Sequence, residues 1–260
     1  MSQQAHGLPN VAKISIHAPF RWLSRGWQDF LTAPLPFLIY GIVLAAISAM
    51  IAWALVFSSA FAWVFVLAGG FFLVAPILAM GLYEGARMLE ADETPGLTDI
   101  ILIRGALRLD LAYLGTALFL IYLFWTRIAQ IVYALSTPYM HKTPQDFLSF
   151  MFTTTDGITM AATGSLIGGL IAFLAFSLIV VSAPMMLGSK TDVFIATITS
   201  VRCVAQNFGP MLVWGLLIVA LTALGIATAS FGLILVFPLI GLASWHAYRD
   251  LVPDPLRVSA

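Results

Sequence analysis

The chain alternates between long apolar runs and short polar links. Six runs reach the length of about 20 residues that a helix needs to cross the hydrocarbon core of a bilayer. A helix satisfies its own backbone hydrogen bonds in lipid, so runs of this length predict membrane-spanning helices. The six runs cover residues 36–56, 61–83, 111–133, 160–187, 211–229 and 233–248.

Segments of mixed polarity precede three of the runs. The first, residues 19–30, places Phe20, Leu23, Trp27 and Phe30 at three- and four-residue steps, which is the spacing of one face of a helix. The other two are residues 97–109 and 191–208, and Thr191 or Asp192 is a candidate N-cap for the last. We expect all three to be short amphipathic helices at the membrane surface.

The runs pair into three hairpins of the same orientation. The exits of the first and third match, because Pro76 and Pro238 are each followed at equal offsets by an aromatic residue and an arginine. Prolines and aromatic residues also gather at membrane boundaries without any repeat, and this alternative stays open. The second hairpin carries an outer insert, residues 137–156, which contains a further candidate helix. The hairpins cover residues 36–83, 111–187 and 211–248.

We therefore expect an all-α, polytopic membrane protein. One membrane domain, residues 19–252, lies between a polar N-terminal segment, residues 1–18, and a C-terminal tail, residues 253–260. Close helix contacts are expected at Gly81-x-x-x-Gly85 and Gly164-x-x-x-Gly168, where small residues let two helices approach.

Composition agrees with this class and limits the partners. Hydrophobic residues make up 61% of the chain and charged residues only 9%, far from the composition of a soluble domain. Twelve basic and twelve acidic residues give no net charge, which argues against nucleic acid as a partner. The expected partners are the lipid bilayer and another membrane protein or a second copy.

The distribution of basic residues orients the chain. The links expected to be outside hold only Lys142, and Arg127 lies within the third run. Because Lys and Arg favour cytoplasmic links, both termini are expected in the cytoplasm, as for a multi-pass protein of a bacterial inner membrane. The basic residues of the cytoplasmic links are Lys13, Arg21, Arg25, Arg87, Arg104, Arg108, Lys190, Arg202, Arg249 and Arg257.

The matching hairpin exits supply a candidate polar site. Glu84 and His246 occupy matching places beside Arg87 and Arg249, and they would face one another across a repeat axis. Interface anchoring by the neighbouring aromatic residues explains the same pattern without a site. Arg127 is the other candidate, because a charge inside a span is costly and often functional. Its long side chain could instead reach the lipid headgroups.

The residues indicate no chemistry of a known kind. The four histidines form no helical metal pair, and phosphate-binding and nucleophile-elbow motifs are missing from the sequence. A single cysteine, Cys203, allows no intrachain disulfide. We therefore predict no catalytic residue, no metal site and no cofactor, and we do not expect an enzyme.

Six short strings of the chain cover residues 81–87, 152–155, 199–204, 207–211, 236–241 and 245–252. They resemble one bacterial membrane family, catalogued as domain of unknown function 2189. The resemblance implies a six-span inner-membrane protein without an assigned activity. Some members carry the label cytochrome c oxidase subunit I, but this chain lacks the histidines for that role. His246 matches one signature histidine of the family, whereas Leu242 stands where the family has a second.

Two functions follow from these observations. The first is a structural, accessory or assembly protein, with a respiratory complex as a candidate partner, because the spans lack acidic residues at mid-depth and the surface helices offer docking sites. The second is a channel or transporter for a small solute, with Glu84, Arg127 and His246 along its path.

Overall fold

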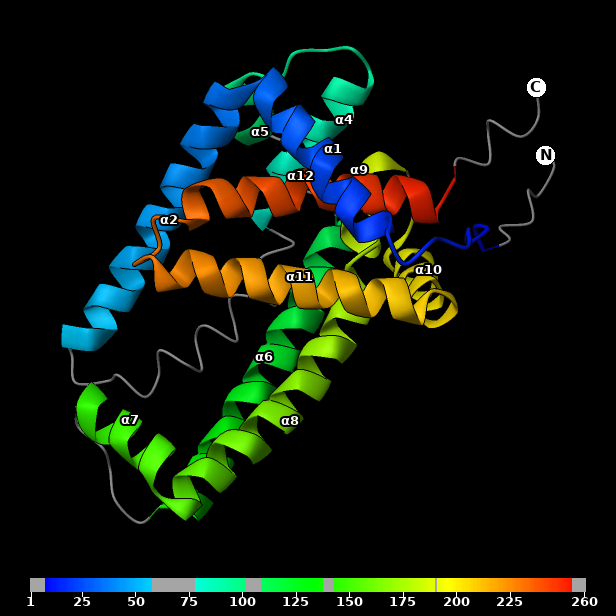
Figure 1. The fold of residues 1–260 in the computed structure, drawn as a ribbon. Coiled ribbons are helices and arrows are strands. Elements are labelled where there is room, and N and C mark those ends of the chain that lie inside the picture. Colours follow the sequence, from blue (N-terminus) through cyan, green and yellow to red (C-terminus); the bar gives the residue numbers. More distant parts are fainter. Residues whose placement is uncertain (1–7, 58–77, 102–108, 138–142, 190, 254–260) are drawn as a thin grey trace.

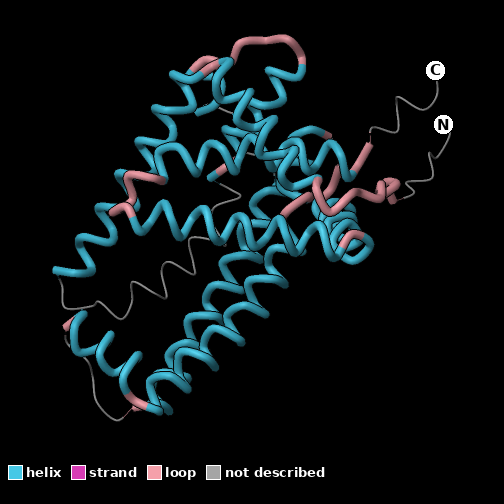
Figure 2. Tube along the Cα trace, viewed as in Figure 1, coloured by secondary structure: helices cyan, strands magenta, loops and turns pink. Residues whose placement is uncertain are grey.

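The computed structural model describes residues 8–57, 78–101, 109–137, 143–189 and 191–253 (Figure 1). These residues form helices joined by short loops, without a β-strand among them, so the all-α prediction is confirmed for this part of the chain (Figure 2). The helices are α1 (Ala18–Thr32), α2 (Pro34–Phe57), α4 (Met80–Glu90), α5 (Leu97–Ile101), α6 (Leu109–Ser136), α7 (Pro144–Thr153), α8 (Thr155–Ile179), α9 (Ser182–Gly188), α10 (Val193–Gln206), α11 (Phe208–Ala227) and α12 (Leu233–Leu251).

Helix α12 is the centre of the described fold. It packs against α1, α2, α4, α9 and α11, and it buries residues along its whole length. Glycines set these contacts: a Cβ on Gly26 of α1 would lie 2.8 Å from the backbone nitrogen of Ala243, and one on Gly41 of α2 would meet the carbonyl of Ile234. Larger side chains at these glycines would push α1 and α2 away from α12.

The two matching hairpin exits lie against each other, since α4 packs on α12. A Cβ on Gly241 would lie 2.5 Å from the side chain of Leu82. On another side of α4, a Cβ on Gly85 would lie 2.6 Å from the ring of Phe37 in α2. The Gly81-x-x-x-Gly85 pattern therefore permits close helix approach, as predicted.

Helices α6 and α8 form an antiparallel pair that extends away from α12 (Figure 1). Trp125 lies over Gly168, where a Cβ would come within 2.6 Å of the indole ring. One to two turns further along, Val132 lies beside Gly164. The second glycine pattern thus also marks a helix contact, and α7, in the outer insert, joins this pair beside α8.

The fourth predicted run is not one continuous helix, because α8 ends at Ile179 and α9 begins at Ser182. Pro184 has no N–H for the carbonyl four residues earlier, and its ring crowds that carbonyl. The backbone N–H of Val181 instead donates to Ser200 Oγ of α10 at 3.1 Å, in a buried position. The break is therefore held by a side chain from a neighbouring helix.

Four predicted spans correspond to helical segments of the described residues that are long and apolar enough to cross a membrane. The second run, residues 61–83, lies mostly outside the described residues. The sixth corresponds to α12, which is not among the four because its second half carries His246, Arg249 and Asp250. Six spans in three hairpins therefore stay a prediction. The four segments are Pro34–Ile51, Ala112–Ser136, Thr155–Gly188 and Phe208–Ala227.

The expected amphipathic segments contain helices. The first is α1, which turns Trp22, Gly26 and Phe30 inward, and the third is α10. Asp192 is the N-cap of α10, since its carboxylate accepts hydrogen bonds from the backbone N–H groups of Phe194 and Ile195 at 2.9 and 3.0 Å. The second segment begins with α5, and its later residues lie outside the described part of the chain.

Candidate functional site

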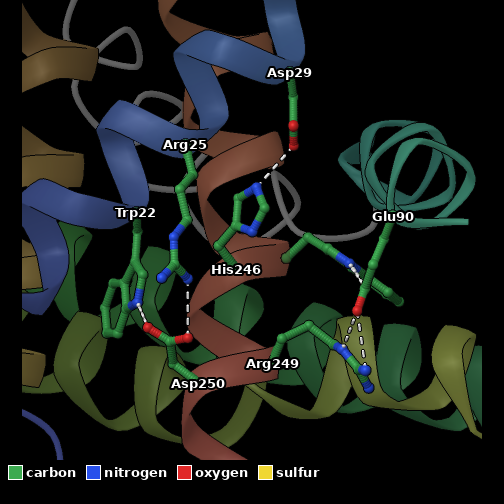
Figure 3. Close-up of polar contacts among 8 residues, drawn as sticks. Trp22, Arg25, Asp29, Glu90, His246, Arg249 and Asp250 are labelled. Carbon is green, nitrogen blue, oxygen red and sulfur yellow. Dashed lines mark hydrogen bonds and ion pairs between the residues drawn. The ribbon is translucent and has the colours of Figure 1, made fainter. Parts of the chain in front are cut away.

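The second half of α12 carries four polar side chains that reach two neighbouring helices (Figure 3). His246 and Asp250 are four residues apart and face α1, whereas Trp245 and Arg249 face α4. We name these four residues and their partners the junction cluster; the partners are Trp22, Arg25 and Asp29 of α1 and Glu90 of α4. It contains His246 and Arg249 of the predicted site, and their partners are residues that the sequence did not single out.

His246 contacts α1 through a carboxylate. Its Nε2 lies 2.7 Å from Asp29 Oδ2, and both side chains are about one-fifth exposed. The contact spans 217 residues of sequence. It therefore fixes the rotational position of α1 against α12. The imidazole involved is the one that we expected, from the sequence, to face Glu84.

Asp250 accepts two hydrogen bonds from α1. Trp22 Nε1 donates to one carboxylate oxygen at 2.8 Å, and Arg25 Nη1 donates to the other at 3.0 Å. The Trp22 side chain is fully buried and meets Trp214 of α11 edge to face, with ring centroids 5.6 Å apart. The carboxylate thus holds the polar edge of a residue whose body belongs to the core.

Glu90 has the equivalent place on α4. One of its oxygens accepts from Trp245 Nε1 at 2.9 Å, and the other accepts from Arg249 Nε at 3.0 Å. An indole and a guanidinium therefore share one carboxylate on each side of α12, as Figure 3 shows. Each oxygen of the two carboxylates therefore accepts a hydrogen bond from a side chain.

The other predicted residues do not join this cluster. Glu84 binds Arg87 of its own helix through two hydrogen bonds of 2.7 and 2.8 Å, and these bonds raise the pKa of Arg87 above its ordinary value. The hydrogen bonds of the described residues do not join Glu84 to His246. Arg127 lies on α6, where its Nη1 donates to Gln130 Oε1 at 3.1 Å. Glu84 and His246 therefore do not pair with each other as expected: Glu84 binds Arg87, and His246 binds Asp29.

A second polar contact closes the same end of the molecule. Asn207, at the start of α11, donates to the carbonyl of Ala12 at 3.0 Å and accepts from the N–H of Ile14 at 3.0 Å. The N–H of Ala12 donates to the carbonyl of Leu251 at the end of α12. The segment around residues 9–14 is therefore bound through its backbone, beside the end of α12.

Packing supplies more of the stability at the junction cluster than charge does. The ion pairs are partly exposed, and such pairs contribute only about 0–1 kcal/mol each. Replacing a fully buried tryptophan by alanine costs about 3–5 kcal/mol, so Trp22 outweighs several of these pairs. The charged residues instead determine how α1 and α4 are aligned along α12, because each must meet one particular side chain.

The sequence held only part of the signal for these contacts. The apolar spacing predicted a helix, but not its inward face: Phe20 and Trp27 are exposed, whereas Trp22 and Gly26 are buried. Asp29 and Arg25 resemble ordinary solvated residues of an amphipathic helix. Glu90 belongs to an acidic link that favours a solvated turn. Asn207 precedes Pro210 and resembles a helix cap. The crossing of α1, α4 and α12 pairs Arg25, Asp29 and Glu90 with their partners, and the return of the N-terminal segment to α11 pairs Asn207.

Among the described residues, groups of three or more His, Cys, Asp or Glu side chains that could hold a metal ion do not occur. In the junction cluster, carboxylates bind indole N–H groups and basic side chains, and these contacts join α1, α4 and α12.

The apolar helices define an integral membrane protein, and comparison with known proteins agrees. Residues 63–188 match the family described as predicted integral membrane protein, domain of unknown function 2189. The resemblance is therefore confirmed for this segment, which contains the strings at residues 81–87 and 152–155. The four later strings lie outside it and stay a prediction. No curated protein and no solved structure matches the chain.

Proposed function

We propose that the protein is a non-catalytic accessory or assembly protein of a bacterial inner membrane. One observation carries this proposal: the polar side chains at the junction cluster bind one another, so they serve the fold. His246 and Arg249, the candidates on α12, are held by Asp29 and Glu90. A protein whose polar groups are used in this way acts most simply by contact with other membrane proteins.

The membrane-facing surface supports the same proposal. In the candidate span of α6 only 6% of the residues are buried within the molecule. The outer part of the α6–α8 pair extends away from the helices around α12 (Figure 1). A long helix with so little internal contact has a large surface for lipid or for a partner. A respiratory complex is one partner class to examine.

We further propose that both chain ends face the cytoplasm and that the chain crosses the membrane six times. The backbone contact between Ala12 and Leu251 supports a common side for the two ends. Arg25 and Arg249 lie at the junction cluster, and Arg202 binds the carbonyl of Pro9 nearby. These basic residues gather at one end of the molecule, which fits the preference of Lys and Arg for cytoplasmic links.

A solute path finds less support. It would need Glu84, Arg127 and His246 along one route, whereas each contacts a different partner on a different helix. A pocket between the ends of α6 and α8 involves none of them. Its lining residues are Ala134, Leu135, Ser136, Thr137, Asp156 and Thr159.

Deletion of the gene in its host tests the accessory role. We expect fewer assembled membrane complexes on native electrophoresis, with respiratory complexes measured first through oxygen consumption. The variants Glu84→Ala and His246→Ala should restore the wild-type pattern, because their ion pairs are partly exposed. Unchanged complexes in the deletion strain, together with solute flux through the purified protein in liposomes, would overturn the proposal.

A further inference from the structure

Helix α6 carries an apolar stripe that contacts no other part of the described chain closely, with a single charge in its middle. Its members are separated by steps of four, three, four and four residues, which place them on one side of a helix. Leu120, Phe124, Ile131 and Leu135 are exposed by 59, 61, 58 and 84%, and the exposed Arg127 lies between them. We name these five residues the α6 seam.

The seam lies opposite the face that α6 uses inside the molecule. Leu114 and Leu118 are buried, Trp125 lies over Gly168, and Val132 lies beside Gly164. At 100° per residue these inward positions fall on the far side of α6 from Arg127. The contact with α8 therefore leaves the seam uncovered.

Arg127 lies deep along the candidate span. It precedes Ser136, the last residue of α6, by nine positions, which corresponds to about 13 Å along a helix axis. Its hydrogen-bond partner among the described residues is the neutral amide of Gln130, at 3.1 Å, and none of its contacts there is to a carboxylate. An unbalanced charge at this depth is costly in lipid.

We propose that the α6 seam is a docking surface for one transmembrane helix of another membrane protein, and that this helix carries an Asp or Glu at the depth of Arg127. Steps of three and four residues along one side of a helix let two helices pack along a common line. The charge specifies the partner, because a carboxylate would neutralise Arg127. A second copy of the chain fits poorly, since the same seam would bring two arginines together. The inference deepens the accessory role proposed above and rests on it.

A defined probe tests the seam without knowledge of the natural partner. The full-length protein is reconstituted in phosphatidylcholine vesicles with a synthetic single-span peptide of Leu and Ala that carries one central Glu. A matched peptide carries Gln at the same place. Binding is followed by energy transfer from tryptophan to a dansyl group on the peptide. Trp125 lies two residues from Arg127 and is one of seven tryptophans that can transfer energy to the dansyl group.

We expect the wild-type protein to bind the Glu peptide about tenfold more tightly than the Gln peptide, in line with the strength of polar contacts between helices in membranes. Arg127→Leu should remove this difference, and Arg127→Lys should retain part of it. Arg127→Gln provides a polar variant should the leucine variant fold poorly, and it should also lose the preference. Circular dichroism checks that each variant keeps its helices.

Equal binding of both peptides to the wild-type protein would overturn the proposal and indicate that Arg127 serves a lipid phosphate. A preference that survives in Arg127→Leu would overturn it as well. The vesicles contain no natural complex, so a negative result here leaves the gene-deletion experiment on the accessory role intact. A negative result in the deletion strain likewise leaves the outcome with the two peptides unchanged.

Discussion

Replacing Trp22 by alanine should loosen α1 from α12 more than any single charge change at the junction cluster. The side chain is fully buried, its ring meets Trp214 at an interplanar angle of 86°, and its Nε1 binds Asp250. Removal of a buried tryptophan side chain costs about 3–5 kcal/mol. For a chain of this size each kcal/mol lowers the unfolding midpoint by about 2–4 °C, so we expect a decrease of roughly 6–20 °C.

The native Cys203 supplies the assay, because it is the only cysteine and is fully buried. A fluorogenic maleimide added during heating in detergent reports the temperature at which Cys203 becomes accessible. Trp27→Ala is the matched control on the same helix, since this side chain is 42% exposed, and it should lower the midpoint by only a few degrees. Trp22→Phe keeps an aromatic ring but removes the indole N–H group, so its midpoint should lie between those of Trp22→Ala and Trp27→Ala. Equal midpoints for the alanine variants would refute the packing account of the junction cluster.

The remaining predictions concern other parts of the same framework. Gly26→Leu should lower the midpoint, because a Cβ there already lies 2.8 Å from α12, whereas Gly169→Ala, with open space around it, should change it little. Asn207→Ala should speed hydrogen exchange at the amide of Ile14 by about tenfold, as measured by mass spectrometry, because one hydrogen bond of about 1 kcal/mol or more is lost; unchanged exchange would contradict this. Burial raises the pKa of the Cys203 thiol to about 12. The reactive thiolate is therefore scarce in the folded protein, so labelling should stay slow from pH 7 to 9 and become much faster after unfolding.

Helix positions were largely predictable because membrane spans and amphipathic segments follow local rules. The first, third and fifth runs, the α1 segment and the cap at Asp192 needed only hydropathy, spacing and capping preference. The fourth run was harder. Pro184 was visible in the sequence, but the break between α8 and α9 also depends on the hydroxyl of Ser200, which arrives from α10.

The pairing of polar residues was not predictable in the same way. Equal offsets in the two hairpin exits suggested that Glu84 would face His246. The structure brings the exits together through Leu82 and Gly241, but a nearer carboxylate on α1, Asp29, binds the imidazole. Periodicity predicts that a segment is helical. It does not indicate which side another helix covers, and the ion pairs depend on that choice.

Reporter fusions at each end of the chain test the central claim most directly, which is that the two ends meet on the cytoplasmic side of a membrane through the contact of Ala12 with Leu251. A fluorescent protein and alkaline phosphatase are each fused to the N-terminus and to the C-terminus, and the protein is recovered from carbonate-washed membranes. The account predicts fluorescence and inactive phosphatase at both ends. Active phosphatase at either end, or release of the protein by carbonate, would contradict it.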